Sequence, residues 1–546
     1  MMRNRRINSA MVFKNRKGDI VNIIELTDEN FAKQVVQYGF FAEQIPRCFS
    51  SKKFSEKLDV LLPLVNIGNN QIKNSTKNTT SPTTISTYKN DISRRILSVP
   101  NPEAFLRIVK LYSKNWDRIK KLAKSDNSLS PITYMRSYSG DELLEEINCE
   151  NIREEHRAKS DFIDGLKECI RVSLGYQYRL TVDIANCYNS IYTHSVTWAM
   201  CGKENAKDYM RTGLPATLKP TYDLGNAIDA FTRFQKNNET NGIVVGPYTS
   251  RIFSELILCS IDKILREDGF IFKRYVDDYK FYFRTEEDAN ESVRAIEKIL
   301  NQYNLNLNLS KTDVQRFPYD NLSNMKDIYT RALNKEGVFG VLNAAAQFHS
   351  NGEKGAYKYA LKYIRKQKLE LKDFDLIFPL LVNIMLIDPK YGKYVLLYLK
   401  KNRLQIDLVK LSKIANNELK QSVKHELQQE SLLFLNMIHD LRLKLSSENL
   451  IDILNSNDDF SIILALDIWR HHKPLVERTR TEAKHINEAV KKLANSLTGE
   501  NYSGSRWLLL YEAEKHSLFP KGTYTPAKKN DFFKALFDND VTFYGA

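Results

Sequence analysis

The stretch Phe270-Ile-Phe-Lys-Arg-Tyr-Val-Asp-Asp-Tyr-Lys-Phe-Tyr-Phe283 is the most informative part of the sequence. Two runs rich in aromatic residues flank the adjacent aspartates Asp277 and Asp278, which predicts a β-hairpin with both carboxylates at its tip. Adjacent carboxylates repel each other, so this arrangement favours a bound cation. Hard oxygen ligands of this kind suit Mg²⁺. Asp-Asp pairs are also common at surface turns, and the hairpin alone leaves that alternative open.

A third carboxylate lies upstream on another predicted strand. Apolar and polar residues alternate from Tyr178 to Ile184, which predicts a half-buried strand with Asp183 on its polar face. A sheet that placed Asp183 beside the hairpin would gather three carboxylates. Two-metal nucleotidyl transfer needs such a group, because one ion activates the attacking hydroxyl and the other holds the triphosphate.

Further segments follow in an order that predicts the fold. Gly242-Ile-Val-Val-Gly246-Pro247 leads into one helix, a second amphipathic helix follows the hairpin, and a strand predicted at Leu305–Leu309 ends at Ser310-Lys311. The predicted order is a strand, a glycine turn with a helix, the hairpin, a helix and a last strand. This order predicts an α+β fold with a ferredoxin-like palm.

Composition narrows the class of protein. A chain of 546 residues with 42% hydrophobic and 27% charged residues is typical of a soluble protein with several domains. The net charge of +15 favours a polyanionic partner such as nucleic acid. Six cysteines without a Cys-x-x-Cys pair argue against a disulfide framework and a structural zinc site, and indicate a reducing cytosol. The longest apolar run, Leu376 to Ile387, is too short to span a membrane.

The change of residue pattern along the chain predicts two domains, 1–344 and 345–546. Residues 1 to about 175 have a mostly helical pattern with a loop at Asn69–Thr87, and the clearest strands follow up to about residue 340. The second domain is predicted to be an all-α helical bundle or irregular solenoid. Its predicted helices include 405–417, 424–442, 460–472, 482–497 and 505–516.

At these residues the sequence resembles reverse transcriptases. Asp183 with Tyr188 looks like motif A, Gly242–Arg251 like motif B, Tyr275–Asp278 like motif C and Leu305–Lys311 like motif D. The resemblance covers about residues 90–315 and implies fingers and a palm, DNA synthesis from dNTPs, and two Mg²⁺ ions, with Mn²⁺ as an alternative. The metal ligands that it implies are Asp183, Ile184, Asp277 and Asp278.

The resemblance also implies roles around the metal site. Tyr188 resembles a steric gate against the ribose 2′-OH, with a core tyrosine as the alternative. Gly246 would let the backbone approach the nucleotide, or it serves a simple turn. Lys311 is a catalytic candidate that neutralises or protonates the leaving pyrophosphate, or it is a solvated lysine.

Arginines are further candidates for nucleotide binding. Arg94 and Arg95 would clamp the triphosphate through bidentate hydrogen bonds, although adjacent arginines are often surface charge. Ser250 and Arg251 would contact the template or the nucleotide. Val245 stands where many retroviral-type enzymes carry glutamine, so we expect different nucleotide contacts there.

A narrower resemblance concerns the bacterial defence-associated reverse transcriptases of the abortive-infection group, AbiK and its relatives. The segments that carry it are Tyr38–Pro46, Cys48–Ser51, Arg94-Arg95 followed by Val99–Pro102, Tyr192–Ser195 with Trp198 and Gly202-Lys203, and Val245–Arg251. It implies anti-phage defence in the bacterial cytoplasm, homo-oligomers, and DNA synthesis without an added template, primed by a tyrosine of the protein. The 28 tyrosines do not show which one would prime. A conventional enzyme copying a partner noncoding RNA, an RNA polymerase and an inactive nucleic-acid-binding scaffold stay open as alternatives.

Two dipeptides that contain histidine, both in the C-terminal region, are candidates for metal ligands. His439-Asp440 matches a known metal-binding dipeptide, but the sequence offers no further ligands at useful spacing, which favours a helix surface. His471-His472 is interpreted as structural or exposed.

Overall fold

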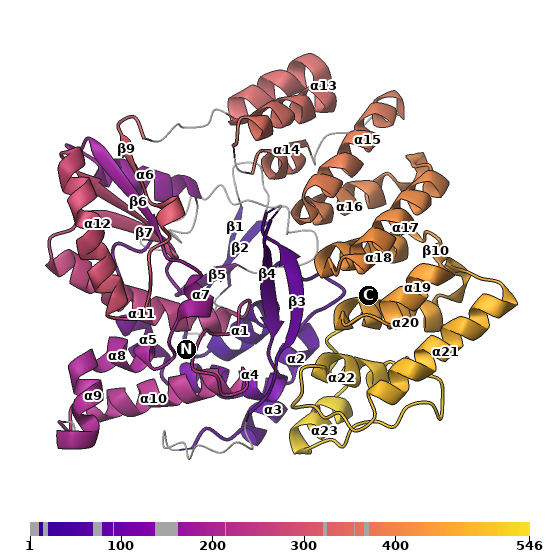
Figure 1. The fold of residues 1–546 in the computed structure, drawn as a ribbon, viewed down its shortest axis with the longest axis horizontal. Coiled ribbons are helices and arrows are strands. Elements are labelled where there is room, and N and C mark those ends of the chain that lie inside the picture. The colour runs from indigo at the N-terminus through magenta and orange to yellow at the C-terminus, as the bar shows by residue number, and fades with distance from the viewer. Residues whose placement is uncertain are drawn as a thin grey trace, which may run out of the picture.

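The computed structural model describes residues 10–545 except 15–19, 69–78, 91, 137–161, 213–214, 320–324, 354 and 365–370. The longer strands lie in the N-terminal part, and helix follows helix from α13 onward in an arc along one side of the molecule (Figure 1). The predicted mixture of helices and strands is therefore confirmed. Among the described residues, no helix is both long and apolar enough to cross a membrane.

A four-stranded antiparallel sheet in the order β7-β8-β6-β9 carries the predicted aspartates. Its strands are β6 (Tyr178–Asp183), β7 (Phe272–Tyr275), β8 (Asp278–Phe283) and β9 (Asp313–Arg316). β7 and β8 form the predicted hairpin, and β6 pairs with β8. Leu180 and Val182 of β6 are fully buried, and α12 (Glu286–Asn301) packs against β6 and β8.

The strand predicted at Leu305–Leu309 was wrong. Leu307 forms only an isolated bridge with Ile184, and residues Leu309–Lys311 form the 3₁₀ turn η4. Hydrogen bonds to Asn308 close this turn: Lys311 N–H donates to its carbonyl and Ser310 Oγ donates to its Oδ1. The local turn chemistry of Asn308 therefore interrupts the alternating pattern, and the edge strand β9 begins only at Asp313.

The first 175 residues hold more strands than their pattern predicts. β1 (Ala10–Lys14), β2 (Ile20–Glu25) and β5 (Tyr134–Arg136) form one sheet, and β3 (Thr83–Tyr88) pairs with β4 (Arg94–Val99). The loop predicted at Asn69–Thr87 was wrong from Thr83 onward, because Thr83, Ile85 and Thr87 alternate inward and are buried. β-branched residues fit such a half-buried strand. Residues 69–78 of that predicted loop lie outside the described residues.

Helices surround these sheets in the N-terminal part. α4 begins where Pro102 follows Asn101, whose side chain accepts hydrogen bonds from the backbone N–H groups of Glu103 and Ala104. The helices of this part are α1 (Phe31–Gly39), α2 (Lys52–Glu56), α3 (Leu58–Leu64), α4 (Pro102–Lys114), α5 (Trp116–Leu122), α6 (Phe162–Val172), α7 (Cys187–Ser190), α8 (Ser195–Cys201), α9 (Lys203–Thr212), α10 (Lys219–Phe234) and α11 (Tyr248–Glu267).

The C-terminal part is built from helices that pack on their neighbours along the chain, such as α17 on α18 and α18 on α20. The five predicted helices there are confirmed with shifted ends. The elements are α13 (Met325–Ser350), α14 (Ala356–Ile364), α15 (Leu371–Ile387), α16 (Gly392–Lys401), α17 (Leu408–Lys424), α18 (Gln428–Leu441), α19 (Ser447–Leu454), α20 (Asp459–His471), α21 (Arg480–Ser496), α22 (Trp507–Lys515), α23 (Asp531–Asp538) and the short parallel pair β10 (Leu445–Ser446) and β11 (Val476–Glu477).

The N-terminal and C-terminal parts share one hydrophobic core. The ring of Phe40 lies 4.9 Å from that of Phe105, 5.5 Å from that of Phe543 and 6.3 Å from that of Trp507, measured between centroids. All four side chains are fully buried. The division predicted after residue 344 falls within α13, which is kinked at Gly337, and it stays a prediction.

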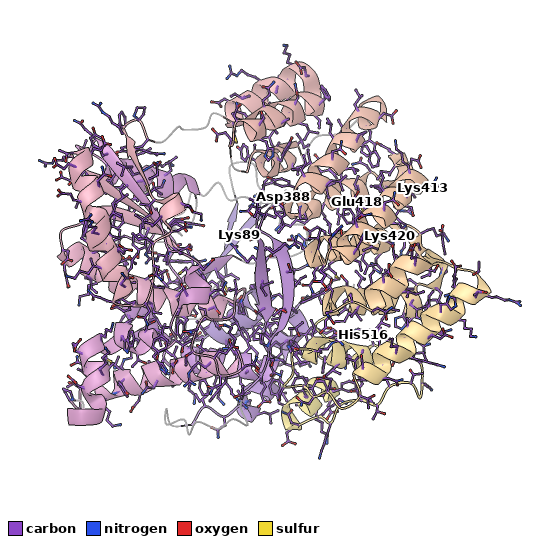
Figure 2. All side chains as sticks on the ribbon, in the orientation of Figure 1. Lys89, Asp388, Lys413, Glu418, Lys420 and His516 are labelled. Carbon is purple, nitrogen blue, oxygen red and sulfur yellow. The ribbon has the colours of Figure 1, made fainter. Side chains whose placement is uncertain are left out.

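Polar contacts also join the β3–β4 pair to the helical part. The backbone N–H of Ser86 donates to Gln428 Oε1 at 2.6 Å, and Lys390 Nζ donates to the carbonyl of Lys89 at 3.2 Å. Lys390 also makes an ion pair with Asp388 at 3.7 Å, and Figure 2 labels Lys89 and Asp388. Strands that carry Arg94 and Arg95 are therefore held by helices far away in the sequence.

Candidate active site

The three aspartates meet at one end of the four-stranded sheet. β6 ends at Asp183, which pairs in register with Asp278 at the start of β8. Asp277 lies in the turn between β7 and β8, directly before Asp278. The arrangement that the sequence predicted for these side chains, one strand beside one hairpin, is therefore the one that the structure has.

A buried arginine supports the turn of the hairpin. Val276 has a φ of 56°, a left-handed conformation that is strained for a β-branched residue. Its backbone N–H donates to Ser130 Oγ at 3.1 Å, and its carbonyl accepts from Arg274 Nη1 at 2.9 Å. The Arg274 guanidinium is fully buried and also pairs with Asp262 at 2.7 Å and Glu255 at 3.0 Å. Arg274 was not predicted as a residue of the site. The only hint in the sequence is a charged residue within a strand rich in aromatic residues.

The carboxylates differ in their electrostatics. Burial raises the pKa of Asp183, but hydrogen bonds from Lys311 Nζ and Asn308 Nδ2, both 2.8 Å, outweigh it and hold that pKa below its usual value. Burial raises the pKa of Asp277, and the charge of Asp183 adds to the effect. Burial and the neighbouring Asp277 raise the pKa of Asp278 to about 6. Negative charge is therefore crowded here, and a cation would relieve it.

Lys311 and Asn308 both reach Asp183 from the turn after the sheet. The Lys311 side chain is 56% exposed, and its ammonium group makes an ion pair with Asp183. Asn308 was not predicted as a site residue, although it lies within the Leu305–Lys311 segment. Its carboxamide donates to the same carboxylate and fixes the side-chain orientation of Asp183.

These groups open into a cavity of about 1110 Å³. Basic residues from several segments also line it, including Arg47, Lys52 and Lys89. Ser250 is the one predicted site residue outside this lining, because it is buried within α11. Ile184 has no polar side-chain atom, so only its backbone carbonyl could ligate a metal. The predicted site residues that line the cavity are Asp183, Ile184, Tyr188, Asp277, Asp278, Lys311, Gly246, Arg94, Arg95 and Arg251.

Tyr188 and Gly246 form part of the cavity wall in different ways. The Tyr188 ring is half-buried, its hydroxyl accepts from Ser254 Oγ at 3.3 Å, and burial raises its pKa to about 12. Gly246 has a φ of 134°, which side-chain-bearing residues rarely adopt. A Cβ there would lie 3.2 Å from Ala42 Cβ and 3.3 Å from the carbonyl oxygen of Ser98. The positive φ and these close approaches together favour glycine, and its predicted approach to a nucleotide stays a prediction.

The predicted arginines have different partners. Arg94 makes a bidentate ion pair with Glu430 of α18, at 2.5 Å and 2.7 Å, which joins β4 to the helical part. Arg251 Nη2 donates to the carbonyl of Ser130 at 2.9 Å, and its guanidinium lies over the Tyr248 ring. Arg94 is therefore occupied by a protein carboxylate, which leaves the predicted triphosphate contact chiefly to Arg95.

Residues 135–338 match the family model described as reverse transcriptase (RNA-dependent DNA polymerase). This segment is similar to a reverse transcriptase domain. It contains all three aspartates and both elements that present them. For this segment the match indicates a nucleotidyltransferase of the RNA-directed DNA polymerase type, a class that uses divalent metal ions.

Similar solved structures include telomerases. Apo telomerase from Candida tropicalis without its C-terminal domain is 14% identical and has a TM-score of 0.29, with 54% of this chain and 61% of that chain covered. Candida albicans telomerase with a TWJ fragment of telomeric RNA is 11% identical with a TM-score of 0.26, at 64% and 66% coverage. Another structure of apo telomerase from Candida tropicalis is 12% identical with a TM-score of 0.31, with 94% of this chain and 78% of that chain covered. In the first two, less than two thirds of the telomerase chain is spanned. No curated protein matches the sequence.

Proposed function

We propose that this protein synthesises DNA from dNTPs at the cavity end of the four-stranded sheet, with Asp183, Asp277 and Asp278 as its catalytic carboxylates. The observation that carries the proposal is the meeting of these residues at the ends of β6 and β8, where they face a cavity of about 1110 Å³. The basic lining of that cavity suits a nucleoside triphosphate and a nucleic-acid strand. In this proposal the sheet with α12 is a ferredoxin-like palm, and the helices from residue 345 form a separate bundle or solenoid-like domain.

The donor set fits two divalent ions, Mg²⁺ or Mn²⁺. The three carboxylates and the Ile184 carbonyl offer hard oxygen ligands, and burial with the neighbouring Asp277 raises the pKa of Asp278, which a bound cation would lower. Bound there, the ions would activate the attacking 3′-hydroxyl and balance the charge of the triphosphate. Arg95 would orient the triphosphate, and the Tyr188 ring would exclude a 2′-hydroxyl. Lys311 would leave Asp183 and donate a proton to the departing pyrophosphate.

The proposal extends to anti-phage defence in the bacterial cytoplasm by a homo-oligomer, with synthesis that is template-independent and primed on a tyrosine. Its support is the narrower resemblance to abortive-infection reverse transcriptases. Several of the segments that carry this resemblance, including Tyr38–Pro46, Cys48–Ser51 and Val245–Arg251, contribute residues to the cavity wall. The five cysteines that the structure describes are free thiols, as expected in a reducing compartment. The priming tyrosine stays unidentified.

Incorporation of labelled dNTPs by the purified protein, with Mg²⁺ and without primer or template, tests the proposal. Asp277→Asn with Asp278→Asn should abolish incorporation, whereas Asp268→Asn, at the exposed end of α11, should leave it unchanged. A product whose gel mobility shifts on proteolysis would support protein priming. Incorporation that survives in the double variant would overturn the assignment of the catalytic carboxylates.

The second candidate is a conventional reverse transcriptase that copies a partner noncoding RNA. The number of basic residues in the cavity lining favours this candidate. Arg47, Lys52 and Lys89 add more positive charge than the binding of one triphosphate requires. Treatment with RNase before the reaction separates the two candidates. Loss of synthesis after this treatment, together with co-purified RNA of one sequence, would favour the templated enzyme.

A further inference from the structure

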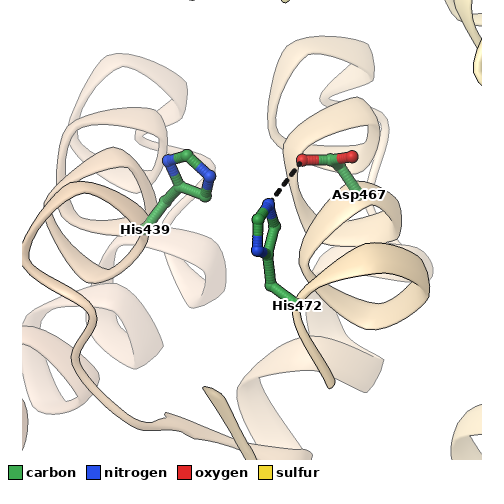
Figure 3. Close-up of side chains that lie close together, drawn as sticks. All are labelled: His439, Asp467 and His472. Atoms are coloured by element: carbon green, nitrogen blue, oxygen red, sulfur yellow. Dashed lines mark ion pairs between the residues drawn. The ribbon is translucent and has the colours of Figure 1, made fainter. Parts of the chain in front are cut away.

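A second group of potential metal ligands lies in the C-terminal helices, far from the catalytic aspartates in the sequence. His439 belongs to α18, Asp467 belongs to α20, and His472 is the C-cap residue directly after α20. One ligand atom from each lies within 4.8 Å of the others. Figure 3 shows the His439 ring on one helix facing Asp467 and His472 on the next. The packing of α18 on α20 thus supplies the ligands that the spacing of His439-Asp440 did not reveal.

His439 carries a polar atom that has no partner. The residue is 6% exposed, and its Nε2 is buried without any hydrogen bond. Its other nitrogen, Nδ1, lies 3.4 Å from Asp440 Oδ1. Buried polar atoms in folded proteins nearly always have a hydrogen-bond partner, so an unpaired one calls for an explanation. Because Nδ1 faces Asp440, the unpaired Nε2 is the atom available to a ligand between the helices.

Asp467 is held in place by residues outside the group. Its Oδ1 lies 2.8 Å from His471 Nδ1, and its Oδ2 accepts from Tyr544 Oη at 2.9 Å. The distance from Asp467 Oδ2 to His472 Nε2 is 3.7 Å, too long for a hydrogen bond. The carboxylate is thus oriented from behind and still separated from the imidazole, as in metal sites whose ligands are fixed by outer partners.

We propose that His439, Asp467 and His472 bind a divalent transition-metal ion, with Zn²⁺ as the preferred ion and water at the fourth position. Two imidazoles and one carboxylate are zinc ligands, whereas Mg²⁺ prefers oxygen ligands alone. The Asp440 carboxylate behind His439 Nδ1 matches the carboxylate–histidine–zinc arrangement. This site is therefore chemically distinct from the catalytic aspartates.

One neighbouring charge must move when the ion binds. Arg442 Nη1 lies 2.9 Å from His472 Nδ1, and an arginine can only donate. Zinc on Nε2 requires a proton on Nδ1, so the Arg442 guanidinium must turn away. Arg442 is exposed at the end of α18, which makes this rotation inexpensive. Asp440 and Asp467 supply negative charge, and Lys400 offsets part of it through an ion pair with Asp440 at 2.9 Å.

The site would stabilise a junction that reaches the cavity. Asp467 holds Tyr544, and the neighbouring Gly545 N–H donates to the Cys48 carbonyl at 2.9 Å. The Ser50 N–H donates to the carbonyl of Phe543 at 2.8 Å, and Ser50 lines the cavity. A bound ion would thus fix α18, α20, the C-terminal segment and one edge of the cavity together.

Zinc binding to the full chain carrying Asp277→Asn and Asp278→Asn tests the proposal without interference from the catalytic carboxylates. After chelation and dialysis, calorimetric titration with Zn²⁺ should show about one bound equivalent, and Co²⁺ should give the visible absorption of a four-coordinate site. Adding His439→Ala or His472→Ala should remove both signals. His485→Ala, an exposed histidine on α21, is the matched control and should remove neither.

Circular dichroism checks that each variant is folded. If His439→Ala fails to fold, His472→Ala carries the test, because the His472 ring is 28% exposed. Equal Zn²⁺ uptake in the ligand variants and the His485→Ala control would overturn the proposal, as would a parent chain that binds no Zn²⁺.

Discussion

The Tyr188 ring supplies the first test of the cavity, since its hydroxyl is held by Ser254 and its face borders the site. Tyr188→Ala should raise the relative incorporation of ribonucleotides at least about tenfold, because removing the ring opens space for a 2′-hydroxyl. Tyr188→Phe keeps the ring and should retain the wild-type preference. Competition between labelled dGTP and GTP measures the ratio. Equal selectivity in Tyr188→Ala and the wild type would make Tyr188 a core residue.

Lys311 has two separable roles, charge neutralisation and proton donation. Lys311→Ala should lower kcat by about 10²-fold or more if the ammonium protonates the pyrophosphate. Lys311→Arg keeps the ion pair with Asp183 but donates a proton poorly, so it should stay close to the alanine variant. Single-turnover incorporation measures both. Full activity of Lys311→Arg would show that only the charge matters.

The location of some site residues could be predicted from the sequence, and that of others could not. Asp183, Asp277 and Asp278 were predictable because strand periodicity and a hairpin place them by local rules. Arg274 was not, because its partners Glu255 and Asp262 lie on α11 and meet it only through packing. The His439 group was hidden for the same reason, since two helices bring its members together.

The pairing of β4 with α18 rests on Arg94 and Glu430, whose side chains are 25% and 14% exposed. A double-mutant cycle with Arg94→Ala and Glu430→Ala should give a coupling of about 1–3 kcal/mol, because a bidentate, partly buried pair exceeds a surface pair. Urea unfolding measures it. Lys420 with Glu448, an exposed pair, is the control and should couple by less than about 1 kcal/mol. A coupling near zero for Arg94 would refute this role.

The start of α20 makes stability depend on pH. Burial raises the pKa of Asp458 from 3.8 to about 7, so the folded protein holds this proton more tightly than the unfolded chain. Its contribution to stability is fully present below about pH 4 and is lost as pH rises through 7. Asp458→Asn keeps an oxygen for the Ser461 N–H and removes the titration. Between pH 5 and 8 the wild type should lose about 2 kcal/mol more stability than the variant, by urea unfolding. Equal losses would contradict the prediction.

Helices and strands were predicted best where one periodicity runs unbroken, as in β6, β8 and the helices after residue 400. The error at Leu305–Leu309 arose because the side chain and carbonyl of Asn308 build a turn within an alternating pattern. The Thr-rich residues of β3 looked like a loop by composition, yet their alternate burial against neighbours makes a strand. Composition alone does not report such contacts.

Trp507 joins the two parts of the molecule. It is fully buried between Phe40 and Phe543, and its Nε1 donates to the Val99 carbonyl at 3.3 Å. Trp507→Ala should destabilise the protein by about 3–5 kcal/mol, and polymerase activity should fall with it. Trp507→Phe should cost less because most of the ring packing remains. Thermal unfolding followed beside dNTP incorporation checks both, and a stable, inactive Trp507→Ala variant would contradict this account.

The hydrophobic core that the N-terminal and C-terminal parts share could not be predicted from the sequence. The change from strands to helices near residue 345 predicts two domains, and nothing in the pattern shows that Phe40 packs on aromatic rings near the C-terminus. Such contacts depend on tertiary packing between residues that are remote along the chain. The family match at residues 135–338 likewise stops well before Trp507 and Phe543.

The packing of Phe40 on Phe543 also sets an order of events during protein synthesis. About 500 residues separate them, so at about 5–20 residues per second the ribosome needs about 25–100 s between the two. During that interval the aromatic side chains around Phe40 lack the Trp507 and Phe543 rings that later cover them, so they are open to binding by chaperones. A transcript that ends early would yield a chain that holds all three aspartates yet cannot complete the wall beside them. Activity would then appear only once translation has run through the last helix.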